Sequence, residues 1–185
     1  MAIQEVQELH TQLVSTVNDM LQGHDSFRDA LGLDDEQVLA LAVFARELVD
    51  QGRLDDAQTM LEGLVVLDPQ NGYLHTCLGA LYMQKGFNDA AMVELAYALH
   101  QDAKDIAAAT YLGELYLEAG DLEGSVKYLE QAVNLDPEGR DPYANRARML
   151  AALVATIARE VQEKGPDALK DLQQRAAMLQ EMGNA

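Results

Sequence analysis

The stretch LVVLDPQNGYLHTCLGALYMQKG, residues 64–86, decides the fold of this chain. It is a mostly apolar run that is interrupted by Asp68-Pro69 and then by two glycines. The phrase Leu-Asp-Pro returns at 135–137, which is 68 residues after its first occurrence at 67–69, and 68 is twice 34. A fixed distance of this kind indicates an internal repeat.

Three glycines set the register of this repeat. Gly52, Gly86 and Gly120 are 34 residues apart, and we expect each to end one helix and open a turn, where a positive φ is needed. Other residue types recur in the same register: Ala45, Gly79 and Gly113; Leu48, Tyr82 and Tyr116; Ala57, Ala91 and Ser125; Leu61, Leu95 and Leu129; and Pro69, Ala103 and Pro137. The small residues of the first set predict a close approach of two helices in each unit.

The order L-G-x2-Y, then A-x3-F or L, then Pro, with a period of 34, is the tetratricopeptide pattern. An ordinary helical bundle with coincidental glycine spacing is the alternative. Because the units 38–71, 72–105 and 106–139 agree at many positions, we predict an all-α protein. It is a tetratricopeptide repeat superhelix of three helix-turn-helix units with flanking N- and C-terminal helices.

The flanks differ from the repeats. Residues 3–22 are predicted to form an amphipathic helix, with one apolar stripe made of Ile3, Val6, Leu9, Leu13, Val17 and Met20. Asp34 or Asp35 is the expected cap of the first repeat, Asp141-Pro142 starts a long helix, and Gly165-Pro166 breaks it. The predicted parts are 1–37, the N-terminal helix and linker; 38–139, the repeats; 140–164, a capping helix at 143–163; and 165–185, a C-terminal helix at 167–182 or tail.

Charge and composition exclude several classes of protein. The 185 residues carry a formal net charge of −18, which disfavours binding to nucleic acid or to an anionic membrane. No apolar stretch approaches the roughly 20 residues of a membrane span, and the acidic N-terminus does not resemble a secretory signal. Cys77 is the single cysteine, and its Leu-flanked setting predicts a buried thiol in a reducing compartment. We therefore expect a cytoplasmic protein that does not insert into membranes.

The first helix of each unit is expected to line a concave groove. Helical spacing places the second, fifth, ninth and twelfth residues of each unit on that face, and we call these twelve the inner positions. They are Leu39, Ala42, Arg46, Val49, Tyr73, Thr76, Ala80, Met83, Ala107, Thr110, Glu114 and Leu117. The lining suits an extended peptide with a few apolar side chains, for which Tyr73 and Met83 are candidate anchors. Alternatively, some of these residues pack on the helix at 143–163 or on the N-terminal helix.

The residues do not form a catalytic or metal-binding constellation. The four histidines have no partner at ligand spacing; they are His10, His24, His75 and His100. Paired acids such as Asp55-Asp56 stand at helix starts, where capping explains them. We predict a protein that is not an enzyme and that uses no metal and no cofactor.

The stretch from Phe27 to Leu135 resembles the class II chaperones of bacterial type III secretion systems, which hold hydrophobic translocator proteins before export. The resemblance rests on the run LGLDDEQVLALAVFARELVDQGRLDDAQTMLEGLVVLDPQNGYLHTCLGALYMQKG, and within it on LEGLVVLDP and YLHTCLGALY. It implies a groove for a short Pro- and Leu-containing segment of a translocator, and a homodimer built through the N-terminal helices. The family tends to have aromatic residues on the first inner helix, whereas this chain has Ala42, Arg46 and Val49 there.

The residues and the resemblance together predict a non-enzymatic peptide-binding chaperone. It would hold hydrophobic type III secretion translocator proteins in the bacterial cytoplasm, because an acidic clamp can cover an apolar segment that would otherwise aggregate. A general tetratricopeptide adaptor or scaffold for protein–protein assembly is the alternative. A third hypothesis is an assembly protein whose N-terminal stripe builds an oligomer.

Overall fold

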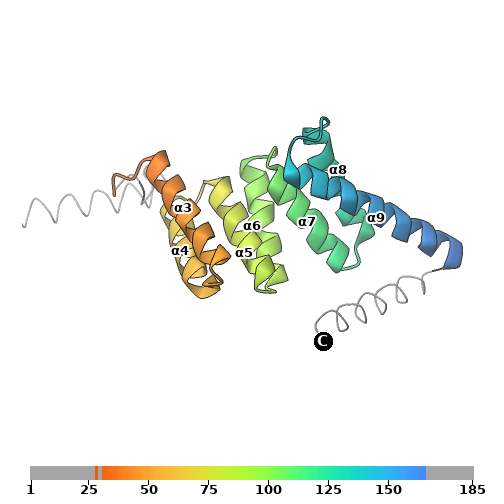
Figure 1. Cartoon of the computed structure of the whole chain (residues 1–185), viewed down its shortest axis with the longest axis horizontal. Helices are drawn as coiled ribbons and strands as arrows, with labels where there is room; N and C mark the ends of the chain where they lie inside the picture. Colours follow the sequence, from red (N-terminus) through yellow and green to blue (C-terminus); the bar gives the residue numbers. More distant parts are fainter. Residues whose placement is uncertain (1–27, 29–30, 166–185) are drawn as a thin grey trace, which may run out of the picture. The chain divides into compact units, whose positions relative to one another are not determined.

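The computed structural model describes residue 28 and residues 31–165 of the chain. These residues contain seven helices and no strand, which confirms the all-α class (Figure 1). The helices are α3 (Asp35–Asp50), α4 (Leu54–Leu67), α5 (Gly72–Gln84), α6 (Asn88–Gln101), α7 (Ile106–Glu118), α8 (Leu122–Leu135) and α9 (Pro142–Lys164). The helices predicted at 3–22 and 167–182 lie outside the described residues.

The chain forms two compact units, which divide between Ala103 and Lys104. In the first unit α3 pairs with α4 and α5 pairs with α6, while α5 also contacts both α4 and α3. In the second unit α7 pairs with α8, and α9 packs against both of them. Each repeat is therefore an antiparallel helix pair, as the sequence predicts.

The 34-residue period holds to the residue in the structure. The second helices begin at residues 54, 88 and 122 and end at 67, 101 and 135, and the first helices end at 50, 84 and 118. Between the two helices of each pair, Gly52, Gly86 and Gly120 have φ values of 76°, 77° and 79°. A residue with a Cβ is strained at such a φ, so glycine is the residue that these turns require.

The second helices end in the same way in all three repeats. The residue after the helix is Asp68, Asp102 or Asp136, with φ near −134° and ψ of 73°, 99° and 74° respectively. A following proline favours this extended conformation, and Pro69 and Pro137 supply it. However, α6 ends at the equivalent residue although Ala103 takes the place of the proline. The helix end therefore does not depend on the proline ring there.

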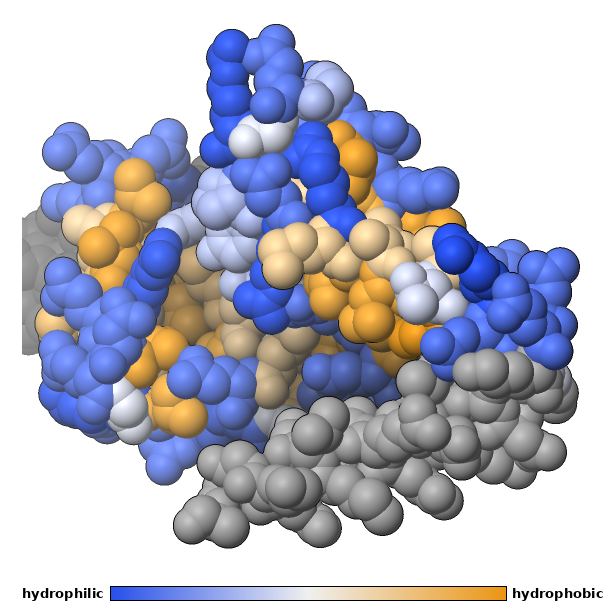
Figure 2. Space-filling model, turned by 45° about the vertical axis from the view of Figure 1, so that its right-hand side comes forward, coloured by the Kyte–Doolittle hydropathy of each residue, from blue (hydrophilic) through white to orange (hydrophobic). Residues whose placement is uncertain are grey.

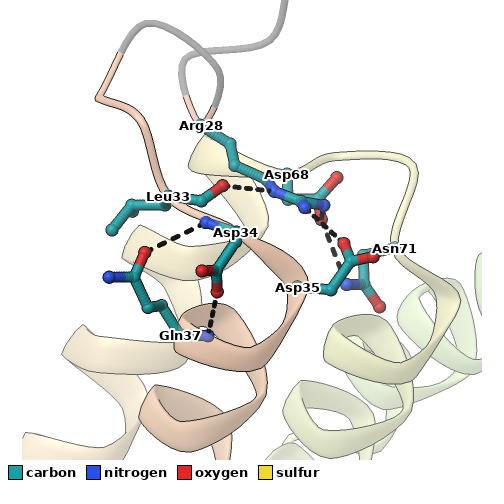
Figure 3. Close-up of polar contacts among 7 residues, drawn as sticks. All are labelled: Arg28, Leu33, Asp34, Asp35, Gln37, Asp68 and Asn71. Atoms are coloured by element: carbon teal, nitrogen blue, oxygen red, sulfur yellow. Dashed lines mark hydrogen bonds and ion pairs between the residues drawn. The ribbon is translucent and has the colours of Figure 1, made fainter.

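The first repeat begins with a capping box. The Asp34 carboxylate accepts a hydrogen bond from the Gln37 N–H at 2.8 Å, and the Gln37 side chain accepts one from the Asp34 N–H at 3.0 Å (Figure 3). Of the two expected caps, Asp34 is therefore the N-cap, and Asp35 is the first residue of the helix. By contrast, α4 and α6 have no side-chain cap, so their acidic first-turn residues act mainly on the helix dipole.

Small residues allow the helices of a pair to approach closely. A Cβ placed on Gly79 would lie 2.6 Å from the Cγ atom of Leu95, and one on Gly113 would lie 2.6 Å from the Cγ atom of Leu129. Both leucines are fully buried, so the predicted close approach is confirmed. Cys77 is only half-buried, and the prediction of a buried thiol is wrong in that respect.

The surface is mostly hydrophilic, with hydrophobic patches between charged side chains (Figure 2). The exposed large hydrophobic residues are Leu31, Leu39, Val43, Phe44, Val66, Tyr73, Phe87, Val93, Tyr97, Met149 and Leu153. They lie on both first and second helices and on α9. Their positions decide which surface could hold a partner.

Candidate functional site

The inner positions of α3 divide into an exposed half and a buried half. Leu39 is 51% exposed and Arg46 is also exposed, whereas Ala42 is buried and Val49 is half-buried. Ala42 belongs to the core cluster of the first unit, and Val49 packs against that cluster. On α3, therefore, Leu39 and Arg46 are the inner residues that a ligand could contact most fully. Val43, one turn after Leu39, extends the exposed apolar strip.

On α5 the exposed inner residue is Tyr73, at 43%. Ala80 and Met83 are half-buried and can present part of their surface to a ligand. Thr76 is buried, and its hydroxyl donates a hydrogen bond to the Gly72 carbonyl at 3.2 Å. Because α3 and α5 are in contact, the first unit presents Leu39, Arg46 and Tyr73 on neighbouring helices.

The inner positions of α7 are partly covered by α9. Thr110 is fully buried, and its hydroxyl lies 2.8 Å from the Ile106 carbonyl and 3.2 Å from that of Tyr143. Tyr143 also packs edge-on against Tyr111, with ring centroids 5.5 Å apart. Thr110 therefore packs on the helix after the repeats, which is the alternative that the sequence left open for the inner positions.

Glu114 is covered in the same way. It is buried, and Arg146 of α9 donates two hydrogen bonds to its carboxylate, at 2.5 and 2.9 Å. Burial raises the pKa of Glu114 above its ordinary value, although the hydrogen bonds and charge of Arg146 act in the opposite direction. Of the inner positions on α7, only Ala107 and Leu117 remain half-buried.

Phe44 is an exposed aromatic residue that sequence reasoning did not single out. It occupies the position of Leu78 and Leu112 in the other two repeats, where both side chains are buried. In the first repeat the side chain is 47% exposed. A repeat normally covers this position with its neighbour, and no described helix precedes α3. The only signal in the sequence was that this unit is the first.

A buried histidine joins the two helices of the second repeat. The Nδ1 atom of His75 lies 2.6 Å from the Glu94 carboxylate, and its Nε2 atom lies 2.9 Å from the Pro69 carbonyl oxygen. A carbonyl oxygen can only accept, so Nε2 carries a hydrogen and donates it. The ring also packs on Tyr97 at a centroid distance of 4.3 Å. The sequence suggested only scattered histidines, and this cluster explains His75 as structural.

The segment before α3 is tied to the end of the first repeat. Arg28 donates a hydrogen bond to the Asp68 carboxylate at 3.0 Å and another to the Leu33 carbonyl at 3.0 Å, and it also pairs with Asp35 (Figure 3). Asn71 donates to the same Asp68 at 3.1 Å. The N-terminal part of the chain therefore joins the first repeat beside the turn between α4 and α5.

Two features that would indicate other functions are absent from residues 28 and 31–165. Those residues contain no group of three or more His, Cys, Asp or Glu side chains that could hold a metal ion. The same part of the chain contains no helix that is long and apolar enough to cross a membrane.

Family comparisons agree with the fold. Two family models described as tetratricopeptide repeat match the chain, one over residues 43–106 and the other over residues 82–153. A curated relative, "Tetratricopeptide repeat protein 37" of Xenopus laevis, is 30% identical over 86 residues, which make up 45% of this chain. The matched part is only 6% of that protein's length.

Solved structures match a larger part of the chain. A type III secretion complex from Aeromonas hydrophila is 21% identical, with a TM-score of 0.66 over 77% of this chain and 96% of that one. The translocator chaperone SycD of Yersinia enterocolitica is 20% identical, with a TM-score of 0.62 over 70% and 98%. PcrH, in complex with the chaperone binding region of PopD, is 24% identical, with a TM-score of 0.61 over 68% and 96%. The likeness supports the fold, and together with the family models it shows that this chain is a tetratricopeptide repeat protein.

Proposed function

We propose that this protein is a non-enzymatic chaperone that holds a hydrophobic type III secretion translocator protein in the bacterial cytoplasm. The observation that carries the proposal is the extent of the structural match. The chain covers 96% to 98% of three solved structures that come from type III secretion. The match therefore extends over nearly the whole of those chains. PcrH has been solved with the chaperone binding regions of both PopD and PopB.

We place the binding surface on α3 and α5, in the first unit. Leu39 and Tyr73 expose enough apolar surface to contact the side chains of an extended segment, and Met83 and Ala80 can add to it. Arg46 supplies donors for the carbonyl groups of such a segment. The inner positions of the second unit are less suited to this role, because Thr110 and Glu114 are engaged by α9.

A general adaptor function is the second candidate, and one comparison favours it. The first tetratricopeptide domain of Spaghetti, bound to the HSP90 peptide SRMEEVD, is 20% identical with a TM-score of 0.59 over 94% of that chain. That peptide carries three acidic residues and one arginine. A chain with a net charge of −18 repels it, and Arg46 is the one cation among the twelve inner positions. We therefore favour an apolar or basic client over an acidic one.

We also infer that two copies associate through residues 3–22. SycD has been solved in an alternative dimer, and the apolar stripe of this segment needs a surface to cover. Phe44 lies at the N-terminal edge of the first repeat with 47% of its side chain exposed. A helix of a second copy that packs there would cover it, as a neighbouring repeat covers the equivalent leucines.

Co-expression with the hydrophobic translocator proteins encoded in the same genome tests this function. We expect one of them to become soluble and to co-purify in a fixed ratio. Leu39→Glu should lower the amount bound at least about tenfold, because an unpaired charge would be desolvated under the client. Val66→Glu is the matched control, since Val66 is an exposed apolar residue of the second helix of the same repeat. The control should bind as the wild type does.

The outcomes separate the function from the site. A wild-type protein that solubilises none of these translocators would show that the chaperone proposal is wrong. If a translocator binds and Leu39→Glu retains it as well as Val66→Glu does, the first helices are not the binding surface. Circular dichroism of both variants ensures that a loss of binding is not a loss of fold.

A further inference from the structure

One side of α9 carries apolar residues that no described element covers. Met149 is 75% exposed and Leu153 is 49% exposed, and because one follows the other by a single helical turn they lie on one face of the helix. The opposite side of α9 is buried, with Ala144, Ala147 and Val154 fully covered in the second unit. Figure 2, in which this end of the chain comes forward, shows hydrophobic surface among hydrophilic side chains there.

The helix α9 stands in the chain where the first helix of a fourth repeat would stand. It follows Asp136-Pro137, as α5 follows Asp68-Pro69, and it packs on the preceding pair α7 and α8. In each of the three repeats the first helix is covered by a second helix that begins two residues after a left-handed glycine. The helix α9 also ends at a left-handed glycine, Gly165, with a φ of 85°.

The twenty residues after Gly165 have the apolar spacing of a second helix. In α4 the residues Leu54, Ala57, Leu61 and Leu64 are separated by steps of three, four and three, and the last three are buried. The segment 166–185 has the same steps in its own sequence: Leu169, Leu172, Ala176 and Leu179. Asp167 stands next to Pro166 at its start, a combination that favours the beginning of a helix.

The length of this segment matches the distance to be covered. Met149 lies 16 residues before Gly165, which is about 24 Å of helix at a rise of about 1.5 Å per residue. A helix that runs back from Gly165 over residues 166–185 spans about 30 Å on the same basis. At similar distances from the turn, Leu179 reaches the level of Leu153, and Met182 reaches the level of Met149.

Charge also favours this occupant. The helix α9 has four basic and two acidic residues, whereas residues 166–185 have two basic and three acidic residues. The rest of the chain is strongly acidic and repels an acidic segment. The surface of α9 is therefore the one part of the described structure whose charge attracts the C-terminal segment.

From these observations we propose that residues 166–185 form the second helix of a fourth, terminal repeat and dock on the Met149–Leu153 face of α9. The docked helix closes the C-terminal end of the repeat array and covers a surface that would otherwise bind a second copy or a client. This inference is independent of the chaperone function, since it concerns contacts within one chain.

Engineered disulfides test the docking in the full-length protein. In a Cys77→Ser background, the pair Leu153→Cys and Leu179→Cys is compared with the pair Ala155→Cys and Leu179→Cys. Ala155 is an exposed residue on a different side of α9, so it serves as the matched control. A disulfide needs Cβ atoms about 3.5 to 4.5 Å apart, and we expect the first pair to oxidise about tenfold faster than the control.

The products are resolved by non-reducing electrophoresis and by peptide mapping. A fast disulfide within one chain for the Leu153 pair alone supports the proposal. Equal rates for the two pairs, or no disulfide in either, would overturn it, because the segment would then not rest on this face. A disulfide that joins two chains would also overturn it and would assign the surface to a second copy. Circular dichroism before oxidation checks that all variants retain their helices.

Discussion

Gly113→Ala is the substitution that tests the packing of the repeats most directly. The added Cβ would lie 2.6 Å from both Cγ and Cδ2 of Leu129 and 3.3 Å from its backbone nitrogen. Leu129 is fully buried, and Cγ is its branching carbon rather than a flexible end. The leucine can therefore escape only if its whole side chain changes rotamer inside a packed core or if α7 and α8 move apart.

The expected change in stability is the difference of two effects. Overpacking of this kind costs about 1 to 3 kcal/mol, whereas replacing a glycine by alanine inside a helix gains roughly 0.8 to 1 kcal/mol. The Gly63→Ala variant isolates the second effect, because Gly63 lies in α4 and a Cβ added there would have nothing within 4 Å. We expect Gly63→Ala to stabilise the protein and Gly113→Ala to be about 1 to 3 kcal/mol less stable than that control.

Urea unfolding followed by the helical circular dichroism signal measures both variants against the wild type. The double variant Gly113→Ala with Leu129→Ala adds a second check. Removing the leucine opens the space that the new methyl group needs, so the two changes should be markedly non-additive. If Gly113→Ala proves as stable as Gly63→Ala, the close approach of α7 and α8 is not a constraint, and this account of the small residues is wrong.

Two further predictions concern the ends of the repeat array. Burial raises the pKa of Glu114 from 4.5, so the folded state binds more protons than the unfolded state just above pH 4.5, and the contribution of this group to the free energy of unfolding falls as the pH rises through that window. Glu114→Gln should abolish this fall, which urea midpoints between about pH 5 and about pH 7 can measure; an unchanged pH profile would contradict it. Deleting residues 1–22 should halve the mass of the protein measured by light scattering, and an unchanged mass would refute association through that segment.

The helix boundaries could be predicted closely because they depend on local signals that recur. A glycine that must take a positive φ, and an Asp followed in two repeats by a proline, act within a few residues of the helix end. Even so, the proline proved dispensable at Ala103. What determined the end of α6 was the extended conformation of Asp102, which the sequence pattern identified only through its equivalents in the other repeats.

The exposure of the inner positions could be predicted only in part. Helical spacing shows which residues share a face, but it does not show which other helix lies on that face. Glu114 and Arg146 are 32 residues apart, and no periodic pattern connects them. Phe44 shows the same limit, because its equivalents Leu78 and Leu112 are buried and its own exposure follows from the lack of a described repeat before it.

The binding properties of this protein therefore depend on its non-repeating parts. Three repeats with one sequence pattern supply similar inner faces, yet Leu39 and Tyr73 are open in the first unit while Thr110 and Glu114 are closed by α9 in the second. A change in α9 would act on ligand binding by uncovering inner positions, whereas a change in α3 would act by direct contact. An apolar client, which gains affinity from buried area, should accordingly be more sensitive to Leu39 and Tyr73 than to any inner residue of α7.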